Sequence, residues 1–326
     1  MNAIILTRMI HSRGFCLGVT FAVLVSACIY YFSGFYLPIT GSRGLSLPSA
    51  NEWFPNATLD FAAGLAGAAA TALIMVLLNK IYNVLRSYTY LYLALFAAMQ
   101  LATADLLTQF YSGTLLAIIV PLCQMLLFPC FREPMLTRHV FVIFLLLSFF
   151  TATQYCFALF FPVFLIGLGQ MRIFNARSLL AAVMGAVTPW WLMLGFGLIE
   201  PQNIALPVFA SIFSEIGSED TLLLLVTIGI TVFAMLICYV LNLLKTIAYN
   251  ARARAINGSF TLTALFTVAA TCIDYRNILS YVPLLNYCAA MEITHFFSTH
   301  KGEKSFIPVF ILLAAYAAIF ACQIVI

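Results

Sequence analysis

The sequence predicts an all-α membrane protein, a polytopic bundle of about eleven transmembrane helices that forms one integral membrane domain over residues 1–326. Three observations predict this fold class. Of the 326 residues, 64% are hydrophobic and only 8% are charged, whereas soluble domains are roughly 45–50% apolar and about 25% charged. A mean hydropathy of +1.06 leaves too few polar side chains to cover a surface in water. The apolar residues also fall into runs long enough to cross a bilayer.

Charged and turn-forming residues separate these runs, and each run is interpreted as one helix. The first run follows Arg8 and Arg13 and is longer than the roughly 7–15 residues of a signal-peptide core. We therefore expect it to be a membrane helix. The predicted spans are 15–37, 61–79, 88–107, 113–131, 139–152, 155–169, 178–198, 221–244, 260–273, 278–297 and 306–326.

Lysine and arginine are unevenly distributed among the connections, which decides how the stretch 139–169 is interpreted. This stretch has no charged residue after His139, so it can form one long helix or two short ones. If it forms two, only Arg43 and Arg276 lie on one side of the membrane, and 13 of the 15 basic residues lie on the other. Because basic connections stay in the cytoplasm, the sequence favours two short helices with a turn at 151–154. The N-terminus is then cytoplasmic and the C-terminus external.

Three predicted spans, 139–152, 155–169 and 260–273, are shorter than the roughly 20 residues that cross a hydrocarbon core. Short helices occur where the bilayer is thinned or where they line a cavity inside the protein. The first two meet at the outer side and the third ends there. We therefore expect an outward-facing cavity.

Small residues in two spans predict close helix packing. Gly64 and Gly67 lie about one turn apart in the span 61–79, and Ala182 and Gly185 have the same spacing in the span 178–198. Small residues such as these let helix backbones approach each other closely in membranes.

Three carboxylates on the outer side are candidates for catalysis. Asp105 lies near the outer end of the third span, where an acidic residue is costly and is usually placed for use. Glu52 and Asp60 lie in, or at the border of, the outer connection 38–60. For Asp105, the alternative is an interfacial acid that simply reaches water one turn away.

Four residues on the outer side are candidates for substrate binding. Arg276 and Arg43 are the only basic residues there, and the guanidinium group suits bidentate phosphate recognition. A local pair between Asp274 and Arg276 is the alternative. Gln154 and Tyr155 lie at the predicted turn and are candidates to line a pocket, although a turn requires polar residues in any case.

Glu292 and His295 are candidates for a proton relay. They are three residues apart in the span 278–297, so they share one face of the helix, toward its cytoplasmic end. A simple interfacial pair near Lys301 is the alternative. No metal site is predicted, because a carboxylate-bridged di-metal bundle requires a second Glu-x-x-His motif and further glutamates.

The remaining composition excludes several other classes of site. The nine cysteines lie in apolar runs without a CxxC motif, which indicates buried thiols rather than disulfides or a zinc site. No cofactor is expected, and no cluster of basic residues is dense enough to predict nucleic-acid binding.

The region from Phe149 to Phe196 has a pattern of short motifs. These are Thr-Ala-Thr-Gln-Tyr at 151–155, an apolar run with Pro162, the basic residues Arg172 and Arg177, and Pro189-Trp190-Trp191. The pattern resembles the short-helix pair and following helix of the type-C glycosyltransferases, which use polyprenyl-linked sugars. The resemblance implies an outward-facing active site with a catalytic carboxylate in the first external loop. Glu52 and Asp60 are available there, but the paired Asp-Glu motif is missing.

The layout of spans also resembles an uncharacterised family of multi-pass bacterial inner-membrane proteins, which implies the same location. Three function classes follow. The first, which the sequence favours, is a glycosyltransferase-like protein, active or catalytically degenerate, with an outward cavity for a lipid-linked sugar or lipid headgroup and with membrane lipids as its partners. The second is a secondary transporter that uses Glu292, His295 and Asp105, although no inverted repeat is visible. The third is a non-catalytic subunit or scaffold that binds other membrane proteins.

Overall fold

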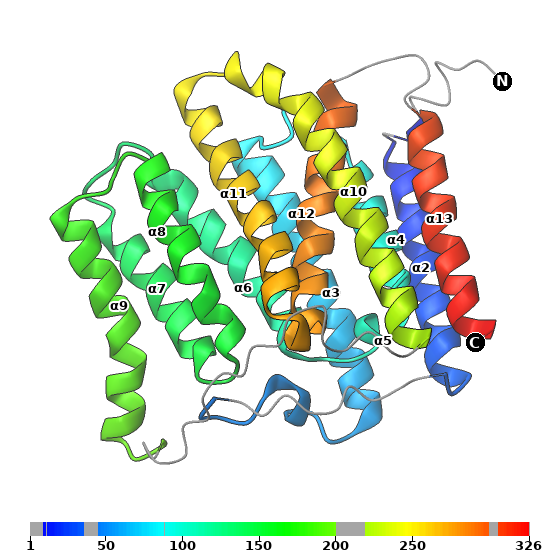
Figure 1. Cartoon of the computed structure of the whole chain (residues 1–326), viewed down its shortest axis with the longest axis horizontal. Helices are drawn as coiled ribbons and strands as arrows, with labels where there is room; N and C mark the ends of the chain where they lie inside the picture. Colours follow the sequence, from blue (N-terminus) through cyan, green and yellow to red (C-terminus); the bar gives the residue numbers. More distant parts are fainter. Residues whose placement is uncertain are drawn as a thin grey trace.

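The structure is a computed structural model that describes residues 9–10, 12–35, 45–87, 89–199, 219–299 and 306–325. Over these residues the chain forms an all-α bundle without strands (Figure 1). Its helices are α2 (Arg13–Phe32), α3 (Ala57–Tyr82), α4 (Leu91–Leu101), α5 (Ala104–Leu107), α6 (Ser112–Leu127), α7 (Thr137–Thr151), α8 (Phe161–Gln170), α9 (Ala176–Gly195), α10 (Glu219–Ile247), α11 (Ala251–Ile273), α12 (Ile278–Thr299) and α13 (Phe306–Val325). Short 3-10 turns are η1 (Ala50–Glu52), η2 (Phe128–Cys130), η3 (Tyr155–Phe160) and η6 (Tyr275–Asn277).

Each of the eleven predicted ranges contains a helix, but the range 88–107 is interrupted between α4 and α5. The hydroxyl of Thr103 lies 3.3 Å from the carbonyl oxygen of Gln100, and such a bond competes with the helical one. The side chain of Gln323 in α13 bridges the interruption. It accepts from the backbone N–H of Ala104 at 3.4 Å and donates to the carbonyl of Ala102 at 3.0 Å.

The prediction that 260–273 is a short span is wrong. Helix α11 begins at Ala251 and has 23 residues, with Asn250 as its N-cap accepting from the N–H of Ala253 at 2.9 Å. Arg252 and Arg254 lie within its first turns and are exposed. Long basic side chains extend toward water while their helix continues, so a charge does not mark the helix end here.

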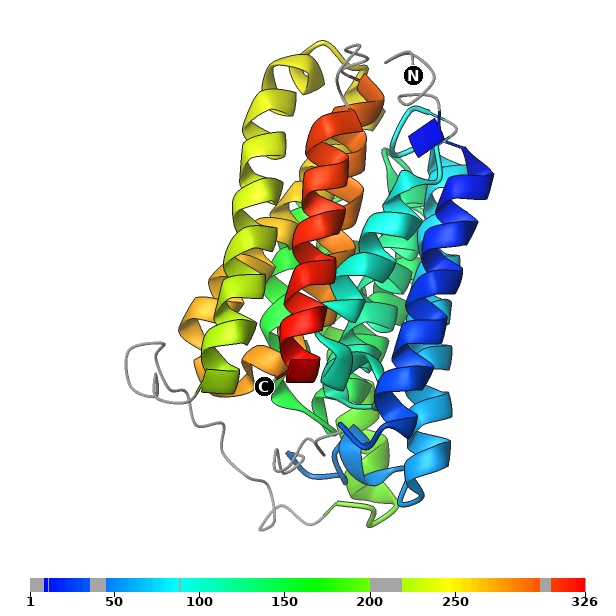
Figure 2. The same ribbon diagram turned by 90° about the vertical axis from the view of Figure 1, so that its right-hand side faces the viewer.

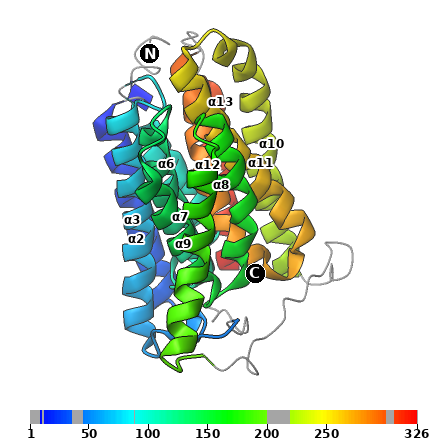
Figure 3. The same cartoon turned by 90° about the vertical axis from the view of Figure 1, so that its left-hand side faces the viewer.

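The prediction of two short helices in 139–169 is confirmed. Helix α7 ends at Thr151, the chain reverses at 152–154, and η3 with α8 returns alongside it. The backbone N–H of Arg132, which precedes α7, donates to the carbonyl of Met171, which follows α8, at 3.0 Å. Both open ends of this hairpin therefore lie at one end of the bundle, as Figure 3 shows.

The two ends of the bundle differ in charge. At one end, uppermost in Figure 1, the connections that follow α3, α6 and α8 carry Arg86, Arg132 and Arg172, and the first turn of α11 carries Arg252. We call it the basic end. The opposite end, called the far end, contains η1, the turn at 152–154 and Arg276 of η6. Helix α2 begins at the basic end and α13 finishes at the far end (Figure 2).

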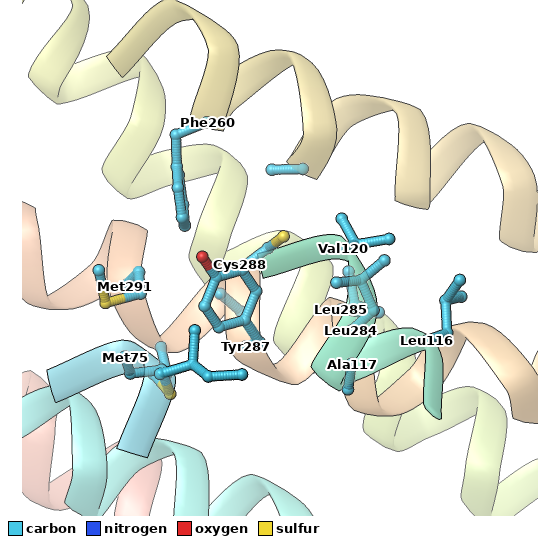
Figure 4. Close-up of a cluster of buried hydrophobic side chains, with 14 of the residues drawn as sticks. Met75, Leu116, Ala117, Val120, Phe260, Leu284, Leu285, Tyr287, Cys288 and Met291 are labelled. Carbon is cyan, nitrogen blue, oxygen red and sulfur yellow. The ribbon is translucent and has the colours of Figure 1, made fainter. Parts of the chain in front are cut away.

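Helix α12 occupies the centre of the bundle, and all but three of its 22 residues are buried. Figure 4 shows its Tyr287 and Met291 near Met75 of α3 and Phe260 of α11, and its Leu284 beside Val120 of α6. Because its neighbours are protein rather than lipid, α12 carries polar residues that a lipid-facing helix avoids.

The outer surface is apolar, in contrast to that of a soluble protein. Phe21 of α2, Phe233 of α10 and Ile311 of α13 have exposed fractions of 69%, 68% and 62%. Among the described residues, seven helices are long and apolar enough to cross a membrane: α2, α3, α6 with η2, α9, α10, α11 and α13. Apolar exposure on this scale requires lipid as the solvent. The chain is a multi-pass integral membrane protein.

Candidate functional site

A cavity of about 320 Å³ opens at the basic end between α8, α10, α11 and α12. Much of its wall is apolar, including Leu262 and Leu265. Polar side chains also reach it, among them Gln170, Asn242, Arg254, Asn257, Thr261, Glu292 and His295. An apolar cavity with a few convergent polar groups is the usual form of a small-molecule site.

Glu292 places a carboxylate on the wall of this cavity. Its side chain is only 7% exposed, and its Oε1 accepts a hydrogen bond from the hydroxyl of Thr261 at 3.1 Å. Within the described ranges, no lysine, arginine or histidine nitrogen lies within ion-pair distance of it. An ionised carboxylate without a counter-charge is strongly disfavoured at such a position. Glu292 is therefore suited to hold a proton or to bind a cation.

His295 lies one turn further along α12, on the wall of the same cavity. It is 7% exposed, and its Nε2 lies 3.4 Å from the hydroxyl of Tyr249. The ring of Tyr249 in turn lies under the guanidinium of Arg86, with 3.5 Å between the guanidinium carbon and the ring centroid. The two proton-relay candidates, Glu292 and His295, thus line one cavity. Tyr249 and Arg86 link His295 to the surface of the basic end.

Three buried polar atoms on this wall have no hydrogen-bond partner among the described residues: Oε1 of Gln170, Nδ2 of Asn242 and Nδ2 of Asn257. Asn242 is only 2% exposed, and its other amide atom accepts from Thr299 at 3.2 Å. An unpaired buried polar group costs about 1–3 kcal/mol, and a polar ligand or ordered water removes this cost. Sequence reasoning missed these residues. The available signal was an asparagine inside the apolar run 221–244.

The three carboxylates predicted for catalysis lie at the far end in separate environments. Asp60, in the first turn of α3, is buried and accepts from the backbone N–H of Phe110 at 2.9 Å. Asp105 accepts from the hydroxyl of Tyr30 at 2.8 Å. Glu52 in η1 is exposed. The hydrogen bonds of Asp60 and Asp105 connect helices and loops, and neither residue lines the cavity at the basic end.

Gln154 and Tyr155 belong to a buried hydrogen-bond network centred on Asp274, which is 0% exposed. The carboxylate of Asp274 accepts from the hydroxyl of Tyr155 at 2.8 Å and from that of Tyr281 at 2.7 Å. The amide of Asn277 donates to the same carboxylate at 2.9 Å, and Gln154 donates to Asn277 at 3.2 Å. The network joins the turn of the α7–α8 hairpin to the connection between α11 and α12.

The two arginines predicted for substrate binding have different outcomes. Arg276 is exposed at the far end. In the described part of the chain, Asp274 bonds to Tyr155, Asn277 and Tyr281 rather than to Arg276, so the local Asp274–Arg276 pair is not formed. Arg43 lies outside the described residues.

Further polar contacts connect α12 to its neighbours in the middle of the bundle. The amide of Asn286 donates to Gln100 of α4 at 3.1 Å. The hydroxyl of Tyr287 donates to Gln124 of α6 at 2.7 Å, and Gln124 donates to Thr263 of α11 at 2.9 Å. These buried side chains are hydrogen-bonded to one another across helices, which indicates a role in helix association.

Comparison with protein-family models, with curated proteins and with solved structures finds no match to this chain. The two resemblances stated from the sequence therefore stay predictions.

Proposed function

We propose that this protein is a secondary transporter of the bacterial inner membrane, in which all eleven helical segments cross the bilayer and the basic end faces the cytoplasm. The cavity at the basic end takes a small cationic or polar molecule, and Glu292 releases its proton as that molecule binds. His295 and Tyr249 pass the proton toward the cytoplasmic surface.

One observation carries this proposal: in the described part of the chain, a buried carboxylate without a basic partner shares a cavity wall with three polar atoms that have no hydrogen-bond partner. Ionisable residues at membrane depth commonly mark ion and proton pathways. A cation that enters the cavity supplies the charge that Glu292 lacks, so binding of the cation and loss of the proton are linked. Coupled transport requires this kind of competition between proton and substrate.

The experiment compares Glu292→Gln with Glu133→Gln in everted membrane vesicles that hold a respiration-driven proton gradient. Glu133 is an exposed glutamate at the same end of the bundle, so it controls for loss of one negative charge. Sodium, potassium and small primary amines are added in turn, and proton release is followed with a pH-sensitive dye. We expect at least one of them to release protons from vesicles with the unaltered protein and with the Glu133 variant. Glu292→Gln abolishes this release.

If none of these cations releases protons from vesicles that contain the unaltered protein, the transporter proposal is wrong.

The glycosyltransferase-like alternative places chemistry at the far end, and the buried Tyr155–Asp274 network beside the exposed Arg276 favours it. In this alternative, the protein acts on a polyprenyl-linked sugar. It predicts a sugar-transfer phenotype that is lost on amide substitution of Glu52, Asp60 or Asp105 and is retained in Glu292→Gln.

A further inference from the structure

A second cavity at the basic end, of about 420 Å³, lies between the end of α3 and the start of α11. Its wall includes Tyr82, Asn83, Arg86, Asn250, Arg252 and Ile256. It adjoins the first cavity, since Val84 and Asn257 line both. Among the described residues, no acidic side chain lines it.

The two arginines of this cavity have no acidic partner in the described ranges. Arg86 has a left-handed backbone, with φ of 53°, and its guanidinium lies on the ring of Tyr249 at 3.5 Å. This stacking holds the plane of the guanidinium without using its N–H groups. Arg252, on the first turn of α11, also lines the cavity. Two guanidinium groups that line one cavity, with no carboxylate among its described lining residues, form a receptor for an anion with several hydrogen-bond acceptors.

We infer that this cavity binds a phosphate group, through Arg86 and Arg252, at the membrane surface of the basic end. The N-terminal end of α11 faces the same space and adds a favourable field for an anion. Ile81 and Ile256 supply apolar wall beside the arginines, which suits the glycerol region of a lipid. The same chemistry is presented by an anionic lipid headgroup and by a soluble phosphate compound. The inference does not depend on the transport proposal.

The first experiment uses the unaltered full-length protein in lipid nanodiscs and measures modification of individual arginines by phenylglyoxal with peptide mass spectrometry. One arm adds phosphatidylglycerol to phosphatidylcholine discs. The other adds inorganic phosphate or pyrophosphate to discs of phosphatidylcholine alone. Arg138 and Arg177 are internal controls, because both are exposed near the basic end and neither lines the cavity.

We expect selective protection of Arg86 and Arg252 in at least one arm. Protection only by phosphatidylglycerol identifies a lipid headgroup, and protection by the soluble anions identifies a phosphate compound. Protection in neither arm overturns the inference. Equal protection of all four arginines also overturns it, since that result reflects general surface charge.

The second experiment compares the double variant R86Q/R252Q with the matched double variant R138Q/R177Q, which removes the same charge from the same end. The protecting probe is titrated while thermal stability is followed. We expect its apparent affinity to fall about tenfold or more in R86Q/R252Q, since charged bidentate contacts are lost, and to be unchanged in the control. Equal affinities in the two variants contradict the inference. If R86Q/R252Q does not fold, the protection of arginines from phenylglyoxal in the unaltered protein decides whether the inference holds.

Discussion

Asp274 shows how one buried residue can join segments that are far apart in the chain. Its carboxylate accepts three hydrogen bonds, from Tyr155 of η3, Asn277 of η6 and Tyr281 of α12. Because all three partners donate, the site requires an acceptor-only group at its centre. A carboxylate meets this requirement, whereas an amide does not.

We predict that Asp274→Asn lowers the free energy of unfolding by about 1–3 kcal/mol. The NH₂ group of asparagine would face groups that already donate hydrogen bonds, so at least one of these bonds is lost. The measurement is reversible unfolding by sodium dodecyl sulfate in mixed micelles. Glu52→Gln is the control, since Glu52 is exposed at the same end and its substitution is expected to change stability by less than about 0.5 kcal/mol. Equal stability of the two variants would show that the network does not stabilise the fold.

Sequence reasoning at the residue scale identified polar positions but not their partners. Gln154 and Tyr155 stand out as polar residues at a predicted turn, and both belong to the network. Asp274 follows Tyr155 by 119 residues, and only the packing of α11 beside α8 brings the two together. The roles of Asp60 and Asp105 depend in the same way on distant atoms, the N–H of Phe110 and the hydroxyl of Tyr30.

At the scale of elements, the contact between α7 and α9 is among the most extensive in the bundle. Helix α9 lies against α7 at one edge of the molecule, on the left in Figure 1. A Cβ added at Gly185 would overlap the backbone carbonyl of Phe141, and the hydroxyl of Ser148 donates to the carbonyl of Ala186. The prediction from Ala182 and Gly185 that this span packs closely is confirmed.

We predict that Gly185→Ala destabilises the protein by about 1–3 kcal/mol, because backbone atoms cannot move aside as a side chain can. Gly229→Ala in α10 is the matched control. An added Cβ there meets no atom within 4 Å, so we expect a change within about 1 kcal/mol, in the stabilising direction. Both are measured by the same unfolding titration. A Gly185 variant as stable as the control would mean that the helices separate easily.

Helix positions were predictable because apolar runs of this length have few other structures available in a membrane. Helix ends were less predictable, for two physical reasons. The arginines of α11 extend toward water without ending the helix. The interruption after α4 depends on Gln323 from α13, which no local pattern near Thr103 indicates.

For the whole molecule, the central expectation is that α7 and α8 form a hairpin whose two open ends face the cytoplasm. Met135 precedes α7 and Phe174 follows α8, and they are 77% and 60% exposed. Trp53 at the far end is 40% exposed. These positions suit labelling, whereas Thr153 in the turn is 2% exposed.

We predict that single cysteines at 135 and 174 react with a membrane-impermeant maleimide only after cells are opened. A cysteine at 53 reacts in intact spheroplasts, because the positive-inside rule places the basic end in the cytoplasm. The background protein lacks the native cysteines, of which Cys272 and Cys322 are exposed. Reaction of 135 and 174 from opposite sides would exclude the hairpin topology.

The enclosed position of α12 has a consequence for how the protein is made. Its hydrogen-bonding side chains, Asn286, Tyr287 and Glu292, would meet hydrocarbon if the helix entered the bilayer alone. The helices that satisfy or surround them, α4, α6, α10 and α11, all precede α12 in the chain. Because synthesis starts at the N-terminus, these four helices are made before α12, and they can surround its polar side chains when α12 enters the membrane.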